Sequence, residues 1–315
     1  MTRRALVTGA SGFIGRHLAA RLRADGWVVH ALCRRAAPGD ALAVPADADL
    51  AQLAATSSFD AVFHLAAAVS SAVAHTELAA SLESNVGIGL RVLDAFSARC
   101  PIVLTGSMWQ HVDARPYRPA TLYAAMKQAQ LDLARYYTDG GASVANVELT
   151  DTYGPDDDRP RLLTALLDAS RTAVPLALTP GEQLVDLVHV DDVVDGLLRA
   201  HDATAATGPG LHEWSISSGA PLTVRQLVAR CADAWGRPVP VQFGARPYRT
   251  HEMFAPWTVH PGVPGYAPRR PLAQGLASLD APDPRPARWP TSPPSDPLSD
   301  HPQEAPRGPI HAHHP

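Results

Sequence analysis

A glycine-rich stretch near the start of the chain, VTGASGFIG at residues 7–15, constrains the fold more than any other feature. It stands between a short apolar run that ends at Thr8 and a segment of helical periodicity at 13–25. Glycines here permit a tight turn, a close approach of the backbone to a pyrophosphate and close packing of a helix on a sheet. The spacing is G-x-x-G-x-x-G rather than G-x-G-x-x-G, and a tight turn without a ligand is the alternative. The position of the stretch favours a dinucleotide site on a helix N-terminus, formed by Gly9, Ser11, Gly12, Phe13, Ile14 and Gly15.

Strand-like and helix-like runs alternate after this stretch. Apolar runs at 27–33, 60–66, 101–106 and 143–149 predict strands, and periodic segments at 76–98 and 121–139 predict helices. Such alternation predicts an α/β fold of the Rossmann type, a doubly wound parallel sheet with helices on both faces. The second half is less regular, with helix candidates near 161–170, 191–201 and 223–235.

We divide the chain on this basis into a dinucleotide-binding domain and a smaller substrate-binding lobe. The domain covers 1–152 with a return segment near 184–201, and the lobe covers 153–280. Residues 281–315 hold eleven of the thirty prolines, which predicts a disordered tail. We expect its histidines, His311, His313 and His314, to be solvated rather than to bind metal.

Composition excludes several classes of function. The formal charge of −4 does not indicate a nucleic-acid partner. Three cysteines have no metal-ligand spacing and form no paired framework, so we expect a reducing compartment and no metal. We see no apolar run long enough for a secretory signal or a membrane span, so we expect a cytoplasmic protein without a membrane partner.

The end of the second strand bears on the choice of dinucleotide. Arg34 and Arg35 stand there, with no carboxylate before Asp40, which favours the 2′-phosphate of NADP over the ribose hydroxyl of NAD. Two solvated arginines on a surface loop are the alternative. Asp49 and Leu50 stand where an adenine-contacting pair could lie, although Asp49 could instead cap the next helix.

The segments TGASGFIG, DAVFHLAA and LYAAMK together resemble the extended short-chain dehydrogenase/reductase family, which includes sugar-nucleotide epimerases, dehydratases and ketoreductases. The resemblance covers roughly residues 3–277. The segments TGSMWQH, DTYGP, PGEQLVDLVHVDDVV and PYRTHEMFAPW are most similar to its branch of CDP-abequose-synthase-like enzymes and NDP-4-keto-6-deoxyhexose 4-ketoreductases. This resemblance implies further cofactor contacts from Leu65, Ala66, Ala67, Thr105, Thr150 and Thr152. It also implies a homodimer through the helices near 76–98 and 121–139.

The resemblance implies that Tyr123 is the catalytic acid and Lys127 its partner. Residues at i and i+4 share one face of a helix, so both can point into one cleft and both can touch the cofactor. We expect the ammonium to lower the pKa of the phenol from about 10 towards neutrality. A half-buried tyrosine beside a solvated lysine is the alternative. Ser107 is the expected hydroxyl that polarises the substrate carbonyl, with Thr105 as the fallback.

Missing groups narrow the chemistry further. Met108 and Trp109 follow Ser107 where the 4,6-dehydratases of the family carry an Asp–Glu pair. His111 is close, and we interpret it as a packing or substrate-contact residue, with a catalytic histidine as the alternative. The missing groups leave plain hydride transfer, and the resemblance then implies NADPH-dependent reduction of the C4 ketone of an NDP-4-keto-6-deoxyhexose. An NDP-sugar 4-epimerase with a tightly bound cofactor and a non-catalytic NADP-binding sensor are the alternatives.

Substrate contacts are predicted from the resemblance and from charge. Asn85 matches a family residue that steadies the active site, with an ordinary mid-helix asparagine as the alternative, and Asp151 lies at the expected mouth of the cleft. Arginine side chains suit the diphosphate because a guanidinium binds phosphate oxygens in pairs. The predicted nucleotide-sugar contacts are Asn85, Ser107, Asp151, Arg161, Arg246 and Arg249.

Overall fold

The structure is a computed structural model that describes residues 2–33, 42–45, 47–69, 73–256 and 260–281. Arg34 and Arg35 lie outside these residues, and so does the proline-rich segment from 282 onward. The predictions made for them stay predictions. Residues 1–282 belong to one compact unit, so the boundary that we placed at 152/153 stays an interpretation.

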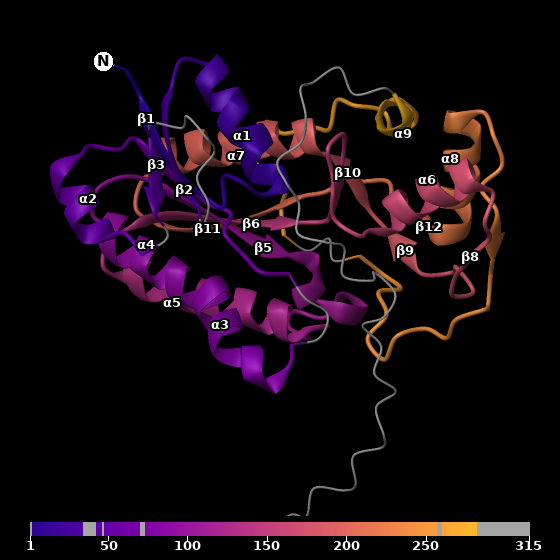
Figure 1. The fold of residues 1–315 in the computed structure, drawn as a ribbon. Coiled ribbons are helices and arrows are strands. Elements are labelled where there is room, and N and C mark those ends of the chain that lie inside the picture. Colours follow the sequence, from indigo (N-terminus) through magenta and orange to yellow (C-terminus); the bar gives the residue numbers. More distant parts are fainter. Residues whose placement is uncertain (1, 34–41, 46, 70–72, 257–259, 282–315) are drawn as a thin grey trace, which may run out of the picture. The chain divides into compact units, whose positions relative to one another are not determined.

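The predicted parallel sheet is confirmed (Figure 1). In the described part of the chain it has seven strands, all parallel, in the order β11-β6-β5-β4-β1-β2-β3. The strands are β1 (Arg4–Thr8), β2 (Val28–Cys33), β3 (Ala43–Pro45), β4 (Ala61–His64), β5 (Ile102–Ser107), β6 (Ser143–Leu149) and β11 (Gly210–Ile216). The two edge strands, β3 and β11, were not predicted.

Helices cover both faces of the sheet (Figure 1). Helices α1 (Phe13–Ala24) and α7 (Val190–Thr207) pack on one face over a core that includes Val7, Phe63 and Leu197. The other face is covered by α2 (Leu50–Thr56), α4 (Ile88–Phe96) and α5 (Leu122–Asp139). Successive residues of an inner strand point to opposite faces of the sheet. Ala5 and Val7 of β1 lie in the first core and Leu6 lies in the second, as expected for strands buried on both faces.

The helix predicted at 76–98 is broken into four pieces. It consists of a 3-10 turn (His75–Glu77), α3 (Leu78–Leu82), a π-helical turn (Glu83–Gly87) and α4. A π turn inserts an extra residue into a helix and often marks a functional site. Here it carries Asn85.

A second core lies among the later elements. Helices α6 (Leu162–Thr172), α8 (Val224–Trp235) and α9 (Leu272–Asp280) enclose Leu166, Leu227 and Leu276. Among the described residues three two-stranded sheets accompany them, β7 (Asp151–Tyr153) with β10 (Leu187–His189), β9 (Leu184–Val185) with β12 (Leu222–Thr223), and β8 (Leu176–Ala177) with β13 (Val241–Gln242). No helix among the described residues has the length and apolar character that crossing a membrane requires.

Candidate active site

The glycine-rich loop joins β1 to α1 and packs against the end of β4. Gly9 has a φ of +67°, and a Cβ there would lie 2.8 Å from the backbone of Ala66. A Cβ on Gly15 would lie 2.1 Å from the carbonyl oxygen of Gly9. Both positions therefore require glycine. No side chain caps the N-terminus of α1 and no acidic residue stands in its first turn, so this helix end suits a pyrophosphate.

The other loop residues divide between surface and core. Ser11 is exposed, whereas Phe13 is buried beneath the guanidinium of Arg159, 4.6 Å from the centre of its ring. Ile14 packs on the core beneath the loop. Ser11 and the backbone of the turn are thus the parts of this loop that a cofactor can reach.

The expected adenine pair has other roles in the structure. The carboxylate of Asp49 accepts a hydrogen bond from the backbone N–H of Gln52 at 3.0 Å and caps α2. Leu50 is buried in the core beneath that helix. The cap that we named as the alternative for Asp49 is therefore present, and an adenine contact stays a prediction.

The end of β4 is held to the glycine loop by a buried network. Thr8 Oγ1 lies 2.8 Å from His64 Nδ1 and accepts a hydrogen bond from the backbone N–H of Ala66 at 3.1 Å. Burial, together with the nearby Lys127 charge, lowers the pKa of His64 to about 3. His64 therefore stays neutral and acts as a fixed support for the half-buried segment Leu65, Ala66 and Ala67.

Strand β5 and helix α5 bring Thr105, Tyr123 and Lys127 together. Thr121 caps α5 through a 3.2 Å bond from the N–H of Ala124, which fixes the turn that carries Tyr123 and Lys127. The ammonium of Lys127 is buried, donates a hydrogen bond to Thr105 Oγ1 at 3.4 Å and lies 5.9 Å from the centre of the Tyr123 ring. Burial lowers the pKa of Lys127 to about 8.

The phenol of Tyr123 differs from our expectation. Burial raises its pKa to about 12, and the opposing charges are those of Arg161 and Arg159. The expected shift towards neutrality is therefore wrong for this structure, because desolvation of the phenolate outweighs the nearby cations. Tyr123 is protonated at neutral pH and is suited to begin a reaction as a proton donor.

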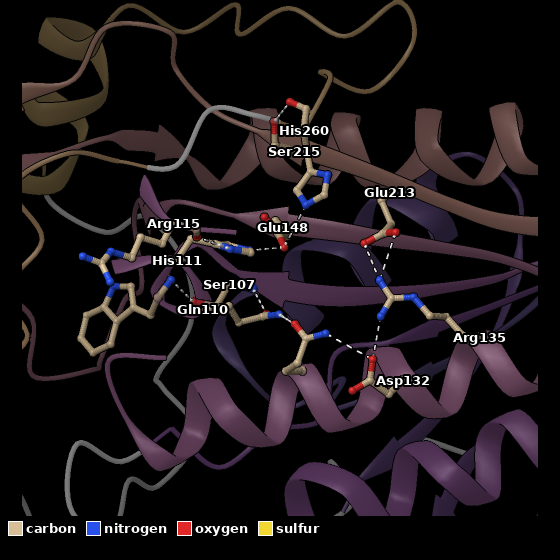
Figure 2. Close-up of polar contacts among 12 residues, drawn as sticks. Ser107, Gln110, His111, Arg115, Asp132, Arg135, Glu148, Glu213, Ser215 and His260 are labelled. Carbon is tan, nitrogen blue, oxygen red and sulfur yellow. Dashed lines mark hydrogen bonds and ion pairs between the residues drawn. The ribbon is translucent and has the colours of Figure 1, made fainter. Parts of the chain in front are cut away.

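Ser107 ends β5 and caps the short 3-10 helix Met108–Gln110. Its Oγ accepts from the N–H of Trp109 at 3.3 Å, which leaves the hydroxyl hydrogen to be donated to a substrate oxygen. Its own N–H donates to Gln110 Oε1 at 2.9 Å, as Figure 2 shows. Gln110 is fully buried and donates to Gln128 Oε1 on α5 at 3.0 Å, so it ties the strand end to the catalytic helix.

Asn85 holds another loop at this end of the sheet. It is 1% exposed, its Oδ1 accepts from the N–H of Ala68 at 3.0 Å, and its Nδ2 donates to the carbonyl of Ala68 at 3.1 Å. The same amide donates to the carbonyl of Ser81 at 2.9 Å. Asn85 thus fixes the segment after β4, and the steadying of the active site that the resemblance implied stays a prediction. A substrate contact also stays a prediction.

Two arginines of the later elements, Arg159 and Arg161, lie near Tyr123. Burial raises the pKa of Asp151 to about 6, and the charges of Arg161, Arg159 and Arg249 partly oppose this shift. Burial lowers the pKa of Arg161, which stands at the N-terminus of α6. Two of the predicted substrate residues, Arg161 and Arg249, therefore lie within electrostatic range of a third, Asp151.

The remaining predicted contacts have structural partners. Thr150 Oγ1 donates to the carbonyl of Ile216 on β11 at 3.2 Å. The carbonyl of Thr152 accepts from Arg159 Nη2 at 2.9 Å. The half-buried Arg246 donates its backbone N–H to the carbonyl of Leu178 at 3.1 Å, whereas Arg249 is exposed. Their ligand contacts stay predictions.

The sequence of this chain matches the family described as the NAD dependent epimerase/dehydratase family over residues 5–214. The chain belongs to this family. Its glycine loop, the hydroxyl-bearing end of β5 and the Tyr–Lys pair of α5 all lie within the matched residues. An NAD(P) cofactor is typical of the family, and the turn at Gly9 and Gly15 fits one.

The similarity of this chain to known proteins is low in sequence identity but extends over most of the chain. CDP-abequose synthase of Salmonella typhimurium is 26% identical over 266 residues, 79% of this chain and 87% of that protein. UDP-glucose 4-epimerase of Mycolicibacterium smegmatis is 28% identical over 311 residues, 87% of this chain and 96% of that protein. The solved structure of MoeE5 in complex with UDP-glucose and NAD is 26% identical, covers 88% of this chain and 97% of that chain, and has a TM-score of 0.75.

Three residues that hold this site in place were not predicted from the sequence. Gln110 and Gln128 link Ser107 to α5, and His64 supports Thr8. Gln110 could have been found, since a glutamine three residues after a serine is the pattern of a capping box. Gln128 and His64 carry no comparable local signal.

Proposed function

We propose that this enzyme uses NADPH to reduce the C4 ketone of an NDP-4-keto-6-deoxyhexose to an alcohol. The observation that carries the proposal is a phenol whose pKa burial raises to about 12, beside a buried ammonium of pKa about 8. Reduction of a ketone develops negative charge on oxygen, and a protonated phenol held in the site supplies the proton that this oxygen needs.

The residues of the chain divide the work as follows. Gly9, Gly12 and Gly15 hold the pyrophosphate, and Arg34 and Arg35 the 2′-phosphate. When bound, the nicotinamide supplies the hydride. Ser107 donates its hydroxyl hydrogen to the carbonyl oxygen and polarises it.

Tyr123 then gives its proton to the oxygen as the C–H bond forms, and a phenolate remains. The ammonium of Lys127 is the stronger acid of the pair, so transfer of its proton to that phenolate is downhill. Solvent protons restore the ammonium. Arg161 and Arg249 bind the diphosphate beside Asp151.

Two further features support reduction as the net reaction. Met108 and Trp109 follow Ser107, so the acid–base pair that water elimination requires is missing from these positions. The similarity to CDP-abequose synthase supports the branch of deoxysugar ketoreductases.

An NDP-sugar 4-epimerase is the second candidate, because the similarity to UDP-glucose 4-epimerase covers 96% of that protein. The two differ in their use of cofactor. Stoichiometric loss of NADPH absorbance with a dTDP- or CDP-4-keto-6-deoxyhexose supports the reductase. Conversion of a UDP-hexose without net oxidation of NADPH would contradict it and support the epimerase.

We also propose a homodimer formed through α3, α4 and α5. These helices present Leu78, Leu82, Leu90 and Tyr136 to solvent, and Tyr136 is 73% exposed. A surface of this kind is typical of a protein–protein contact. A monomer mass in light scattering at micromolar concentration would contradict the dimer.

A further inference from the structure

Three segments far apart in the sequence bring two imidazoles to one carboxylate beside the candidate active site. His111 follows β5, Glu148 lies near the end of β6, and His260 belongs to the segment that pairs with β11. His111 Nε2 lies 2.7 Å and His260 Nε2 3.5 Å from Glu148 Oε1, as Figure 2 shows. One donor atom from each residue lies within 4.8 Å of the other two.

Neighbouring residues make room for this cluster and hold it in place. A Cβ at Gly106 would lie 2.9 Å from Glu148 Cγ, so the glycine on the neighbouring strand makes room for the carboxylate. Arg115 presents its carbonyl to His111 Nδ1 at 3.2 Å. Ser215 on β11 donates to the carbonyl of His260 at 3.1 Å (Figure 2). The partner of His111 is of the kind that orients an imidazole ligand towards a metal, whereas the bond from Ser215 fixes the backbone of His260.

One oxygen of the buried Glu148 carboxylate has no hydrogen-bond partner among the described residues. The side chain is 3% exposed, and the oxygen without a partner is Oε2. A buried carboxylate oxygen without a hydrogen-bond partner is costly, and a bound cation would satisfy it.

Both nitrogens of His111 face oxygens. Nδ1 faces the carbonyl of Arg115, which can only accept, and Nε2 faces the carboxylate. A ring that donates from Nδ1 to this carbonyl keeps a lone pair on Nε2, and that lone pair can bind a cation shared with the carboxylate.

We propose that His111, Glu148 and His260 form a binding site for one divalent transition-metal ion, with Zn²⁺ as the preferred occupant. Two imidazoles and one carboxylate form a ligand set typical of such ions and not of Mg²⁺ or Ca²⁺. Zinc–ligand bonds of about 2.1 Å at tetrahedral angles place ligand atoms about 3.4 Å apart. The separation between His260 and Glu148 is 3.5 Å and already fits, whereas the 2.7 Å separation between His111 and Glu148 must open slightly.

The bound ion would join three segments at the strand end that carries Ser107. It would hold the 108–115 segment and residues 260–262 against β6. This role is independent of the substrate and of the reaction proposed above, so the site can exist whichever reaction the enzyme performs.

The test uses the full chain and measures bound metal directly. The background is a His311→Ala, His313→Ala, His314→Ala variant, which removes the histidines of the C-terminal segment. After treatment with EDTA and loading with Zn²⁺, elemental analysis gives the metal retained per chain. Co²⁺ in place of Zn²⁺ gives a visible absorption band that reports the ligand geometry. His260→Gln and Glu148→Gln test the site, and His75→Gln, at an exposed position, is the matched control.

We expect about one Zn²⁺ per chain in the background and in His75→Gln, with a rise in melting temperature that Mg²⁺ does not produce. We expect at least tenfold weaker binding in His260→Gln and Glu148→Gln. If Glu148→Gln does not fold, the half-buried His260→Gln decides the question. Retention of no zinc by the background, or unchanged binding in His260→Gln, would overturn the proposal.

Discussion

Replacing Asn85 by alanine tests whether the π-helical turn holds the segment after β4. The change removes the partners of both backbone groups of Ala68, its N–H and its carbonyl. Each group left unsatisfied costs about 1–3 kcal/mol, and Ala68 is half-buried, so we expect a loss of about 2–4 kcal/mol in the free energy of unfolding. This is a large part of the 5–15 kcal/mol typical of a folded protein.

Urea unfolding measured by circular dichroism gives this difference. Ser81→Ala is the matched control, because Ser81 Oγ makes only a 3.3 Å contact to Asn85 and a 3.7 Å contact to Met126 Sδ. We expect the control to lose less than about 1 kcal/mol. A loss below about 0.5 kcal/mol in Asn85→Ala would refute the argument that this side chain anchors the segment.

Three further predictions concern the cofactor, the protonation state and the substrate. Gly15→Ala places a Cβ 2.1 Å from the Gly9 carbonyl, so we expect NADPH binding to fall at least 100-fold by fluorescence titration; unchanged affinity would contradict the close approach. The ammonium of Lys127 has a pKa of about 8, so kcat is full below this pH and falls as the pH rises through about 8. Lys127→Arg should move that fall beyond pH 10, and a wild-type profile flat to pH 9.5 would exclude the role. Arg249→Ala should raise KM for the nucleotide sugar about tenfold with kcat little changed, whereas equal effects on KM and kcat would argue against a ground-state contact with the diphosphate.

The glycine loop and the five inner strands of the described sheet were predictable from the sequence, because each depends on residues that are close together in the chain. Gly9 and Gly15 are required by contacts that any strand–turn–helix of this kind makes, and the apolar runs match strands buried on both faces. The edge strands β3 and β11 were not predictable in this way. Strand β3 has only three residues, and the first four residues of β11, which include His212 and Glu213, are only half-buried. Neither strand therefore gives a continuous apolar run.

Other features depend on contacts between distant parts of the chain. The break at Asn85 follows from its bonds to Ala68, seventeen residues away. The pKa of Tyr123 depends on how deeply the later elements bury it, which the spacing from Lys127 does not reveal. Glu148 and His260 are 112 residues apart, so no motif joins them.

In the proposed reaction Tyr123 donates a proton to the substrate oxygen, Ser107 polarises the carbonyl and Lys127 returns a proton to the phenolate. The most direct measurement is the single-turnover rate of NADPH oxidation with an NDP-4-keto-6-deoxyhexose, for the wild type and for Tyr123→Phe with NADPH binding checked separately. The account predicts that the variant binds NADPH normally and loses at least 100-fold in rate. A variant that oxidises NADPH at the wild-type rate would contradict it.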